Sequence, residues 1–319
     1  MASGIAHRRI CETPVAIIDF ETTGLTPGAD RVVEVAVVRI DPQGEASLVL
    51  DTLVNPMRRM AASEIHGISD ADVANAPRFA DIAGELVGVL NDCVIAAYNI
   101  YFDIKFLNSE LFSVGVDHEP PHFCLMYLRP MLGLGSRCKL EIACQSHGIT
   151  YQPTHMAAHD ALAAGRLLSV YLKEAERRGI RTFSELGKLK TYKFVESFHQ
   201  DPLPHPERFR LSGWTRFCSR TDVAAASHID PERVALGTYW DALKTVIADL
   251  DVTDEEAAEV ASERERLGLS AEQVRSMHAR VYASVIQQFS ADKRIDDREA
   301  RQLRRLHRCL STLGWAPGE

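Results

Sequence analysis

The stretch "VAIIDFETTG", residues 15–24, decides the expected fold, because an apolar run of strand type passes directly into two carboxylates, two hydroxyls and a glycine. Asp19 and Glu21 are two residues apart, so on an extended strand both side chains point to the same face. Together they can hold one cation. The hexapeptide "DFETTG" alone leaves another interpretation open, a strand end whose carboxylates are only solvated.

The pattern around this stretch predicts an α/β domain. Two more β-branched runs follow at 31–40 and 46–54, separated by turns rich in Gly, Pro and Asp, and we expect three antiparallel strands. Helix and strand patterns then alternate: helices are expected at 79–90, 102–115, 139–148 and 157–179, and a short buried strand at 93–98. Strands followed by strand-helix units indicate a mixed sheet with helices packed against it.

The chain of 319 residues exceeds one average domain, and we expect one domain plus a smaller one. From residue 222 onward the pattern is helical, with start signals at Asp230, Thr253, Ser270 and Asp296 that predict a small four-helix bundle. The expected segments are an N-terminal tail at 1–13, the α/β domain at 14–183, a linker at 184–221 and an all-α C-terminal domain at 222–319.

The net charge of −8 argues against a generally basic coat for nucleic acid, so binding to phosphates would have to be local or assisted by metal. Only residues 186–220 are basic, with 7 Lys and Arg against 3 Asp and Glu. The seven cysteines form no CxxC pair and are expected to be reduced thiols. No signal peptide or membrane span is recognised, and we expect a soluble, cytoplasmic protein.

The basic linker mixes prolines with basic and aromatic residues and shows no sustained period. A simple connection between domains is one interpretation. The alternative is that its side chains grip a single nucleic-acid strand by charge and stacking. The candidates for this second role are Lys188, Lys190, Tyr192, Lys193 and Phe194.

Two more clusters carry acidic residues. "AAYNIYFDIKFL" places Asp103 at the start of a helix that follows a buried strand, where an aspartate is commonly a helix cap. "HMAAHDA" places His155 five residues before Asp160. Asp160 lies in the first turns of a long apolar helix, where a buried carboxylate is costly unless it meets a cation. The adjacent His159 is expected to be a surface or supporting group, because it lies about 100° around the helix.

Together these segments resemble the DEDD exonucleases and, more narrowly, the DnaQ family of 3′-to-5′ exonucleases. "DFETTG", "NIYFDIKFL" and "HMAAHDA" are similar to the three motifs of that family, and the resemblance covers residues 14–175. It implies a ribonuclease H-like fold with a mixed five-stranded sheet and flanking helices. The histidine five residues before the last aspartate is typical of the DEDDh branch, since a DEDDy enzyme has tyrosine at the position of Met156.

The resemblance implies that Asp19, Glu21, Asp103 and Asp160 bind two Mg²⁺ or Mn²⁺ ions and that His155 is the general base. The donor set suits this role, because hard divalent cations take carboxylate oxygens, and paired ions stabilise the attacking and leaving oxygens of a phosphoryl displacement. Hydrolysis would release 5′-mononucleotides. The residues implied for substrate binding are Thr22, Thr23, Gly24, Leu25, His66, Asn99 and Phe102. Local hydrogen bonding remains the alternative for the two threonines and for His66.

The leading hypothesis is an exonuclease that acts on DNA 3′ ends in proofreading or repair. Two rivals stay open: an RNA-directed enzyme of the oligoribonuclease or ribonuclease T type, and a non-catalytic module that binds nucleic acid or a partner. Residues 291–300 resemble the acidic turn of TerB-type helical domains, a match too short to carry a function. The C-terminal helices are expected to bind a protein partner, to mediate self-association or to extend the DNA path.

Overall fold

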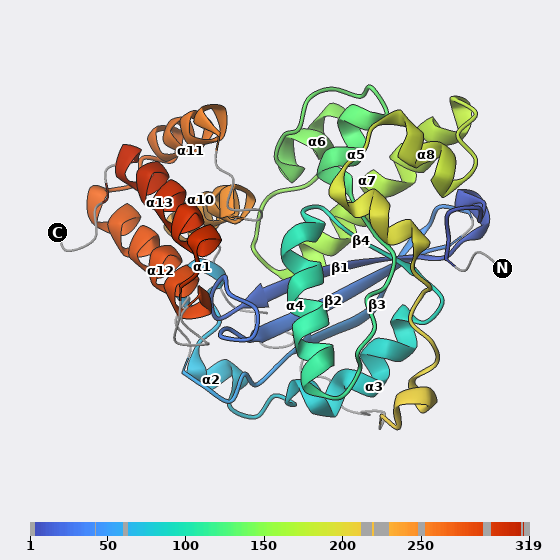
Figure 1. Cartoon of the computed structure of the whole chain (residues 1–319), viewed down its shortest axis with the longest axis horizontal. Helices are drawn as coiled ribbons and strands as arrows, with labels where there is room; N and C mark the ends of the chain where they lie inside the picture. Colours follow the sequence, from blue (N-terminus) through green and yellow to red (C-terminus); the bar gives the residue numbers. More distant parts are fainter. Residues whose placement is uncertain are drawn as a thin grey trace. The chain divides into compact units, whose positions relative to one another are not determined.

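The structure is a computed structural model, shown in Figure 1. It divides into two compact units. The first comprises described residues within Met1–Glu21, Val32–Arg58 and Asp70–Ala226, and the second those within Thr22–Arg31, Arg59–Ser69 and Ser227–Glu319. The residues that the structure describes are 4–41, 43–59, 63–211, 219, 230–247, 253–289, 295–313 and 315.

A five-stranded sheet with the order β3-β2-β1-β4-β5 organises the α/β part of the chain. β2 and β3 pair antiparallel, whereas β1 pairs parallel with β4, and β4 parallel with β5. This confirms the predicted mixed five-stranded sheet. The fifth strand is a three-residue element that the sequence pattern did not locate. The strands are β1 (Val15–Thr22), β2 (Val32–Ile40), β3 (Ala46–Leu53), β4 (Val94–Ala97) and β5 (His122–Cys124).

Helices flank this sheet. The long helix α7 packs on β2 and β3, while α4 contacts β4 and β5 and crosses the strands in Figure 1. Gly165 allows α7 to lie close to the sheet, because a Cβ there would stand 3.0 Å from Val38 and 3.2 Å from Ala46. The helical elements of the first unit are η1 (Ile10–Glu12), α2 (Asp70–Val73), α3 (Phe79–Leu90), α4 (Ile100–Ser113), α5 (Leu125–Met131), α6 (Leu140–Ser146), α7 (Ala157–Arg177), α8 (Phe183–Leu189), η2 (Lys193–His199) and η3 (Pro206–Phe209).

The core of the first unit is built from the apolar runs that the sequence showed. Every residue of β4 is fully buried, as are Ala16, Ile17 and Ile18 of β1 and Val35 of β2. Near-continuous apolar runs of this kind are typical of strands covered on both faces. Burial of such side chains stabilises the fold by about 25 cal/mol for each Å² of apolar surface removed from water.

The second unit contains α1 (Ser63–His66), α10 (Pro231–Ile247), α11 (Asp254–Leu267), α12 (Ala271–Phe289) and α13 (Asp297–Thr312). α10 packs on α1 and α11, and α12 packs on α13. The predicted helix starts are confirmed. Thr253 and Asp296 each cap a helix in a capping box, Asp230 Oδ1 accepts a hydrogen bond from Glu232 N at 3.0 Å, and Gln273 N donates to Ser270 Oγ at 3.3 Å.

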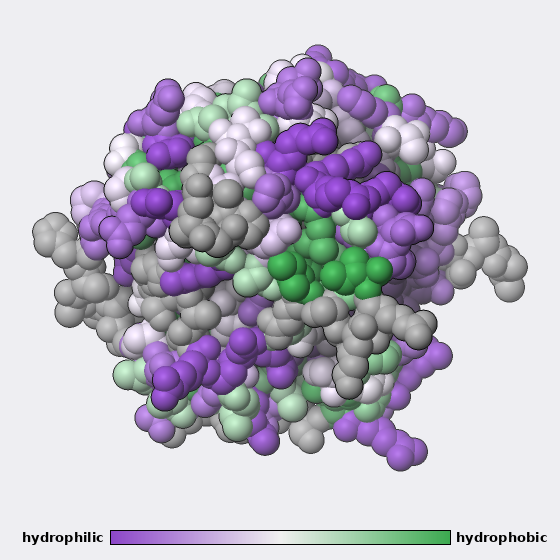
Figure 2. All heavy atoms as spheres, turned by 60° about the vertical axis from the view of Figure 1, so that its left-hand side comes forward, coloured by the Kyte–Doolittle hydropathy of each residue, from purple (hydrophilic) through white to green (hydrophobic). Residues whose placement is uncertain are grey.

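Hydrophilic side chains prevail on the face shown in Figure 2, where hydrophobic ones gather in a smaller patch. This agrees with a chain in which 25% of the residues are charged. Within the described residues, no helix combines the length and apolar character needed to cross a membrane.

Part of the segment predicted as a linker has regular structure. Residues 184–211 carry most of α8, together with η2 and η3, whereas 212–218 and 220–229 lie outside the described residues. The motif at 291–300 that resembles TerB-type domains also begins outside them. The domain boundaries proposed from the sequence stay a prediction.

Candidate active site

The first acidic pair lies on the last residues of β1. Asp19 is half-buried and Glu21 is only 5% exposed, while Phe20 between them is buried in the core. The alternation of side chains along the strand places Asp19 and Glu21 on one face. β1 therefore delivers two carboxylates from a strand that is otherwise apolar.

Asp103 is brought to the same strand by the parallel pairing of β1 with β4. Ile17 lies opposite Ala96, so both strands end at the same edge of the sheet, and α4 begins directly after β4. Asp103 lies in the first turn of α4 and is 6% exposed. Its Oδ1 accepts a hydrogen bond from the backbone N–H of Phe20 at 3.1 Å. The second motif is therefore bonded to the first across 83 positions of sequence.

His155 has an unusual backbone conformation two residues before the start of α7. Its φ angle is +51°, in the left-handed region, and its side chain is 4% exposed. A non-glycine residue in this region is uncommon, and such conformations cost about 1 to 3 kcal/mol and cluster at functional sites. The backbone therefore sets the direction in which the Cα–Cβ bond of His155 leaves the chain, and the imidazole that it carries is buried.

Asp160 lies in the first turn of α7 and is 9% exposed. Its Oδ1 accepts a hydrogen bond from the hydroxyl of Tyr151 at 2.8 Å. The sequence analysis did not single out Tyr151. Its signal is weak, because Tyr151 lies in an irregular segment nine residues before Asp160.

Two buried glutamates that the sequence analysis also missed hold the acidic segments in place. Glu34 of β2 is fully buried, and its Oε2 accepts the backbone N–H of Ala157, the first residue of α7, at 3.2 Å. α7 has no side-chain cap of its own, so Glu34 takes over this function, which suits the positive end of a helix. Glu110 of α4 is 3% exposed and accepts the N–H of Val32 at 3.1 Å. The sequence signal that could have revealed these two residues is an acid within an apolar strand, for Glu34, or on the apolar face of a helix, for Glu110.

The predicted substrate residues at the end of β1 form a compact turn. Thr22 donates its hydroxyl to the carbonyl of Gly24 at 2.5 Å, and Thr23 donates to Asp30 Oδ1 at 3.1 Å. A Cβ at Gly24 would collide with the Asp30 carboxylate, so this position needs glycine. Leu25 is 8% exposed. The threonines thus make the local hydrogen bonds that the sequence left open, and their role in substrate binding stays a prediction.

The other predicted substrate residues lie at three places. His66, at the end of α1, is 1% exposed, and its Nδ1 accepts the N–H of Ile68 at 3.1 Å. Asn99 precedes α4 without a side-chain cap bond. Phe102 packs against Phe106 with ring centroids 4.9 Å apart. Their contact with a substrate stays a prediction.

His159 is exposed, as its helical position predicts, and its Nδ1 lies 3.2 Å from the hydroxyl of Thr154.

The buried thiols of Cys124 and Cys144 stay protonated. Burial raises the pKa of Cys124 to about 11, and the charge of Asp103 contributes in the same direction. Burial likewise raises the pKa of Cys144 to about 12, with a contribution from Asp160. Neither thiol is therefore prepared to act as a nucleophile or metal ligand at neutral pH.

The donor chemistry of the acidic set fits a hard divalent cation. Its four members supply only carboxylate oxygens, and Glu21, Asp103 and Asp160 are each more than nine-tenths buried. Buried carboxylates favour a cation, because removing their charge from water is costly. Across the described ranges, no three His, Cys, Asp or Glu side chains stand as a preformed metal-binding group.

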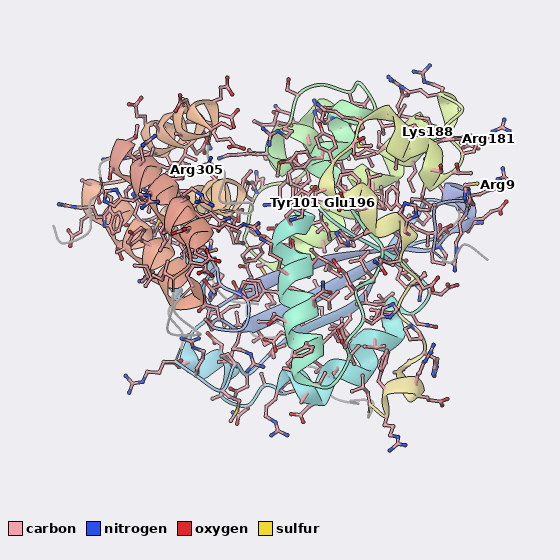
Figure 3. All side chains as sticks on the ribbon, viewed as in Figure 1. Arg9, Tyr101, Arg181, Lys188, Glu196 and Arg305 are labelled. Atoms are coloured by element: carbon pink, nitrogen blue, oxygen red, sulfur yellow. The ribbon has the colours of Figure 1, made fainter. Side chains whose placement is uncertain are left out.

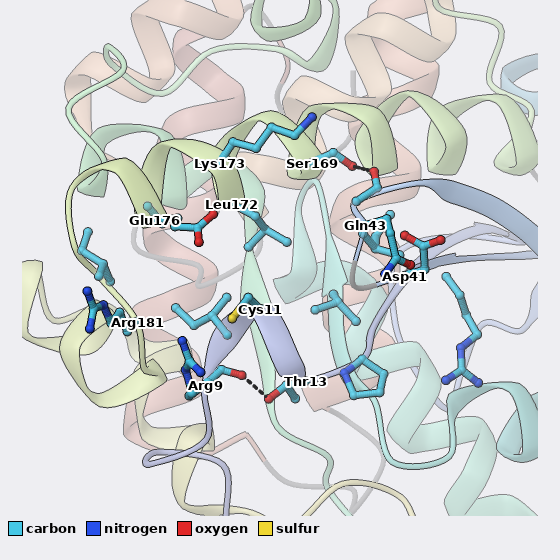
Figure 4. Close-up of a pocket in the computed structure, with 18 of the residues that line it drawn as sticks. Arg9, Cys11, Thr13, Asp41, Gln43, Ser169, Leu172, Lys173, Glu176 and Arg181 are labelled. Atoms are coloured by element: carbon cyan, nitrogen blue, oxygen red, sulfur yellow. Dashed lines mark hydrogen bonds between the residues drawn. The ribbon is translucent and has the colours of Figure 1, made fainter.

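A separate cavity of about 580 Å³ is formed by η1, the end of β2 and α7 (Figure 4). Its lining combines apolar side chains such as Ile40 and Leu172 with charged ones such as Arg9, Lys173 and Glu176. None of the five predicted catalytic residues is among those that line it. The cavity is therefore a different feature from the acidic set.

Comparison with known proteins assigns the class. Residues 16–168 match the exonuclease family RNase_T, and this range includes Asp19, Glu21, Asp103, His155 and Asp160. This part of the chain is a DnaQ-like exonuclease domain. The resemblance to the DnaQ family is thereby confirmed for residues 16–168.

Several DNA polymerase proteins are similar to this chain. The DNA polymerase III subunit epsilon-like protein of Rhodobacter capsulatus is 32% identical over 188 residues, which cover 57% of this chain and 27% of that protein. The PolC-type DNA polymerase III of Thermotoga maritima is 30% identical over 189 residues, covering 57% of this chain and 14% of that protein. The corresponding protein of Bacillus subtilis is 29% identical over 208 residues, covering 62% and 14%. The chain thus spans less than a third of the length of each relative.

Proposed function

We propose that this protein is a metal-dependent 3′-to-5′ exonuclease of the DEDDh type that hydrolyses DNA from its 3′ end and releases 5′-mononucleotides. The observation that carries the proposal is the hydrogen bond from Phe20 N to Asp103 Oδ1, because it joins acids from two distant segments at one end of β1. The match of residues 16–168 to an exonuclease family supports the same reaction class.

In this proposal Asp19, Glu21, Asp103 and Asp160 hold two Mg²⁺ or Mn²⁺ ions. When bound, the ions supply positive charge for the attacking and leaving oxygens of the phosphodiester. The carboxylates direct this charge to one end of β1. An acidic protein can then receive a polyanion, because the cations offset repulsion by the net charge of −8.

His155 is the proposed general base. Imidazole is suited to this task because its unperturbed pKa, about 6.5, lies near neutral pH. The left-handed backbone at His155 sets the direction of its Cα–Cβ bond, and burial limits the motion of the ring. A ring nitrogen of His155 takes the proton of the attacking water and later returns it to solvent. Tyr151 supports the site by orienting Asp160 through their hydrogen bond.

DNA is the preferred substrate in this proposal, because the similar proteins are DNA polymerase III proteins. A role in proofreading or repair follows from the same likeness. The second unit, with its helices α10 to α13, is proposed to bind a protein partner or a second copy of the chain. The cytoplasmic location expected from the sequence stays a prediction.

The test is digestion of 5′-labelled single-stranded DNA and RNA of one sequence by the purified full chain, with Mg²⁺, Mn²⁺ or EDTA. We expect stepwise shortening of DNA that requires the cation, with 5′-mononucleotides as products, and loss of activity in Asp19→Ala. Faster digestion of RNA would favour the RNA-directed alternative. No release of nucleotides, together with equal DNA binding by the wild type and Asp19→Ala, would favour the binding module.

A further inference from the structure

The residues after the exonuclease match pack against earlier segments of the first unit. Phe194 N, in η2, donates to the hydroxyl of Tyr101 at 3.3 Å. Ser197 exchanges two hydrogen bonds with the backbone of His122 in β5, at 2.9 and 3.0 Å. The N-terminal segment also contributes, because Ile5 N donates to Phe198 O at 2.9 Å. η2 is therefore held against the sheet, although it lies beyond residues 16–168.

This folding places three tyrosine rings in a row. The rings of Tyr101 and Tyr127 have centroids 5.6 Å apart, and those of Tyr127 and Tyr192 are 4.7 Å apart. All three side chains are half-buried, so each keeps part of its surface in contact with solvent. Tyr101 stands in the first turn of α4, two residues before Asp103, and is labelled in Figure 3. The row thus begins on the helix turn that carries one of the proposed catalytic acids, although the two side chains lie about 200° apart around the helix.

Positively charged side chains lie close to two of these tyrosine rings. The Cζ atom of Arg137 lies 5.0 Å from the centroid of the Tyr127 ring. Nη1 of Arg137 donates a hydrogen bond to the Tyr127 hydroxyl at 2.9 Å. Lys190 Nζ lies 5.0 Å from the centroid of Tyr192. Lys188, which is labelled in Figure 3, lies near the end of α8 and is exposed. Lys193, at the start of η2, is exposed as well.

Residues 188–200 contain three lysines, which are Lys188, Lys190 and Lys193, and one acid, Glu196. The local charge is therefore opposite to that of the whole chain, which is −8. Partly exposed aromatic rings combined with cations are typical of surfaces that bind single-stranded nucleic acid, because bases stack on the rings and the cations neutralise phosphates.

We propose that Tyr101, Tyr127 and Tyr192, with Lys190, Lys193 and Arg137, form a tract for the single strand behind its scissile 3′ end. This inference rests on the proposed exonuclease function and adds to it a defined path for the substrate. A duplex does not fit this chemistry, because its bases are stacked on one another and show no free faces. The tract would hold a long strand after each cleavage and so favour processive digestion.

The test compares three variants of the full chain. Lys190→Ala/Lys193→Ala removes two exposed charges, and Tyr192→Leu keeps an apolar contact for Tyr127 but removes the stacking ring. Arg208→Ala/Lys173→Ala is the matched control, because both residues are exposed, carry the same charge and lie on η3 and α7. Binding of labelled oligothymidylate of about 20 nucleotides is measured by fluorescence anisotropy in EDTA, and cleavage is measured on that strand and on a dinucleotide.

We expect the lysine pair variant to bind the long strand at least fivefold more weakly than the control and Tyr192→Leu to bind about fivefold more weakly than the wild type. For the lysine pair, the slope of log affinity against log salt should become shallower by about 0.7 for each phosphate that the variant no longer neutralises. Cleavage of the dinucleotide should stay at the wild-type rate. Circular dichroism and thermal unfolding show whether each variant is folded.

Equal affinity and equal salt slope for the lysine pair variant and the control would overturn the proposal, as would parallel losses on the dinucleotide and the long strand. The proposed function fails separately. In that case the wild type would cleave neither substrate, while the anisotropy measurement would still report whether the tract binds a strand.

Discussion

Replacement of His155 separates backbone strain from catalysis. At φ +51°, alanine carries the steric cost of the left-handed region, about 1 to 2 kcal/mol, whereas glycine does not. The glycine variant loses about 0.4 to 1 kcal/mol of the free energy of unfolding, because its unfolded chain has greater conformational entropy. His155→Gly should therefore be more stable than His155→Ala by roughly 0.5 to 1 kcal/mol, although both variants lose the same imidazole.

His159 is the matched control, because it lies four residues further along in α7, is exposed and belongs to an ordinary helix. There glycine should be less stable than alanine by about 1 kcal/mol, which is the opposite sign. Urea unfolding of the four variants at one pH gives the two differences in the free energy of unfolding. The nuclease assay adds the second readout, since both His155 variants should lose about 10² to 10⁴ in rate and both His159 variants should retain activity.

If His155→Ala proved as stable as His155→Gly, the strained conformation of His155 would be refuted. If either His155 variant kept a rate within tenfold of the wild type, its role as general base would be refuted. The two conclusions are independent, because one depends on the backbone and the other on the ring.

Three more outcomes follow from the structure. Tyr151→Phe should raise the Mg²⁺ concentration needed for half-maximal rate about 10- to 100-fold, because Asp160 loses the group that orients it. The variant should stay folded. An unchanged Mg²⁺ titration would contradict this role of Tyr151. Glu34→Ala should lower the free energy of unfolding, measured by urea denaturation, by about 1 to 3 kcal/mol, because the N–H of Ala157 loses its buried partner. A change below about 0.5 kcal/mol would argue against the capping function of Glu34. Burial lowers the pKa of His278 to about 4, so the unfolded chain, with an ordinary histidine pKa of 6.5, binds the proton first as the pH falls. The second unit should therefore be destabilised between pH 6.5 and pH 4, by up to about 3 kcal/mol, and unfolding curves of His278→Gln should lack this component.

The helix starts and most strands follow from local patterns. Thr253 and Asp296 cap their helices as their sequence signals predict, since each partner glutamate is three residues away. β5 escaped the sequence analysis because a three-residue strand is too short to show a period. α5 was missed as well, and it contains Pro130, a residue that normally argues against a helix interior.

The sequence by itself determined the class of the domain and predicted its acidic set, because the spacing of Asp19 from Glu21 and of His155 from Asp160 is local and specific. The tertiary structure alone decided what supports this set. Glu34 caps a helix that begins 123 residues later, and Tyr192 meets Tyr127 from a segment expected to be a linker. Such partners are set by how strands and helices pack, and no short-range period in the chain records an interaction between segments so far apart.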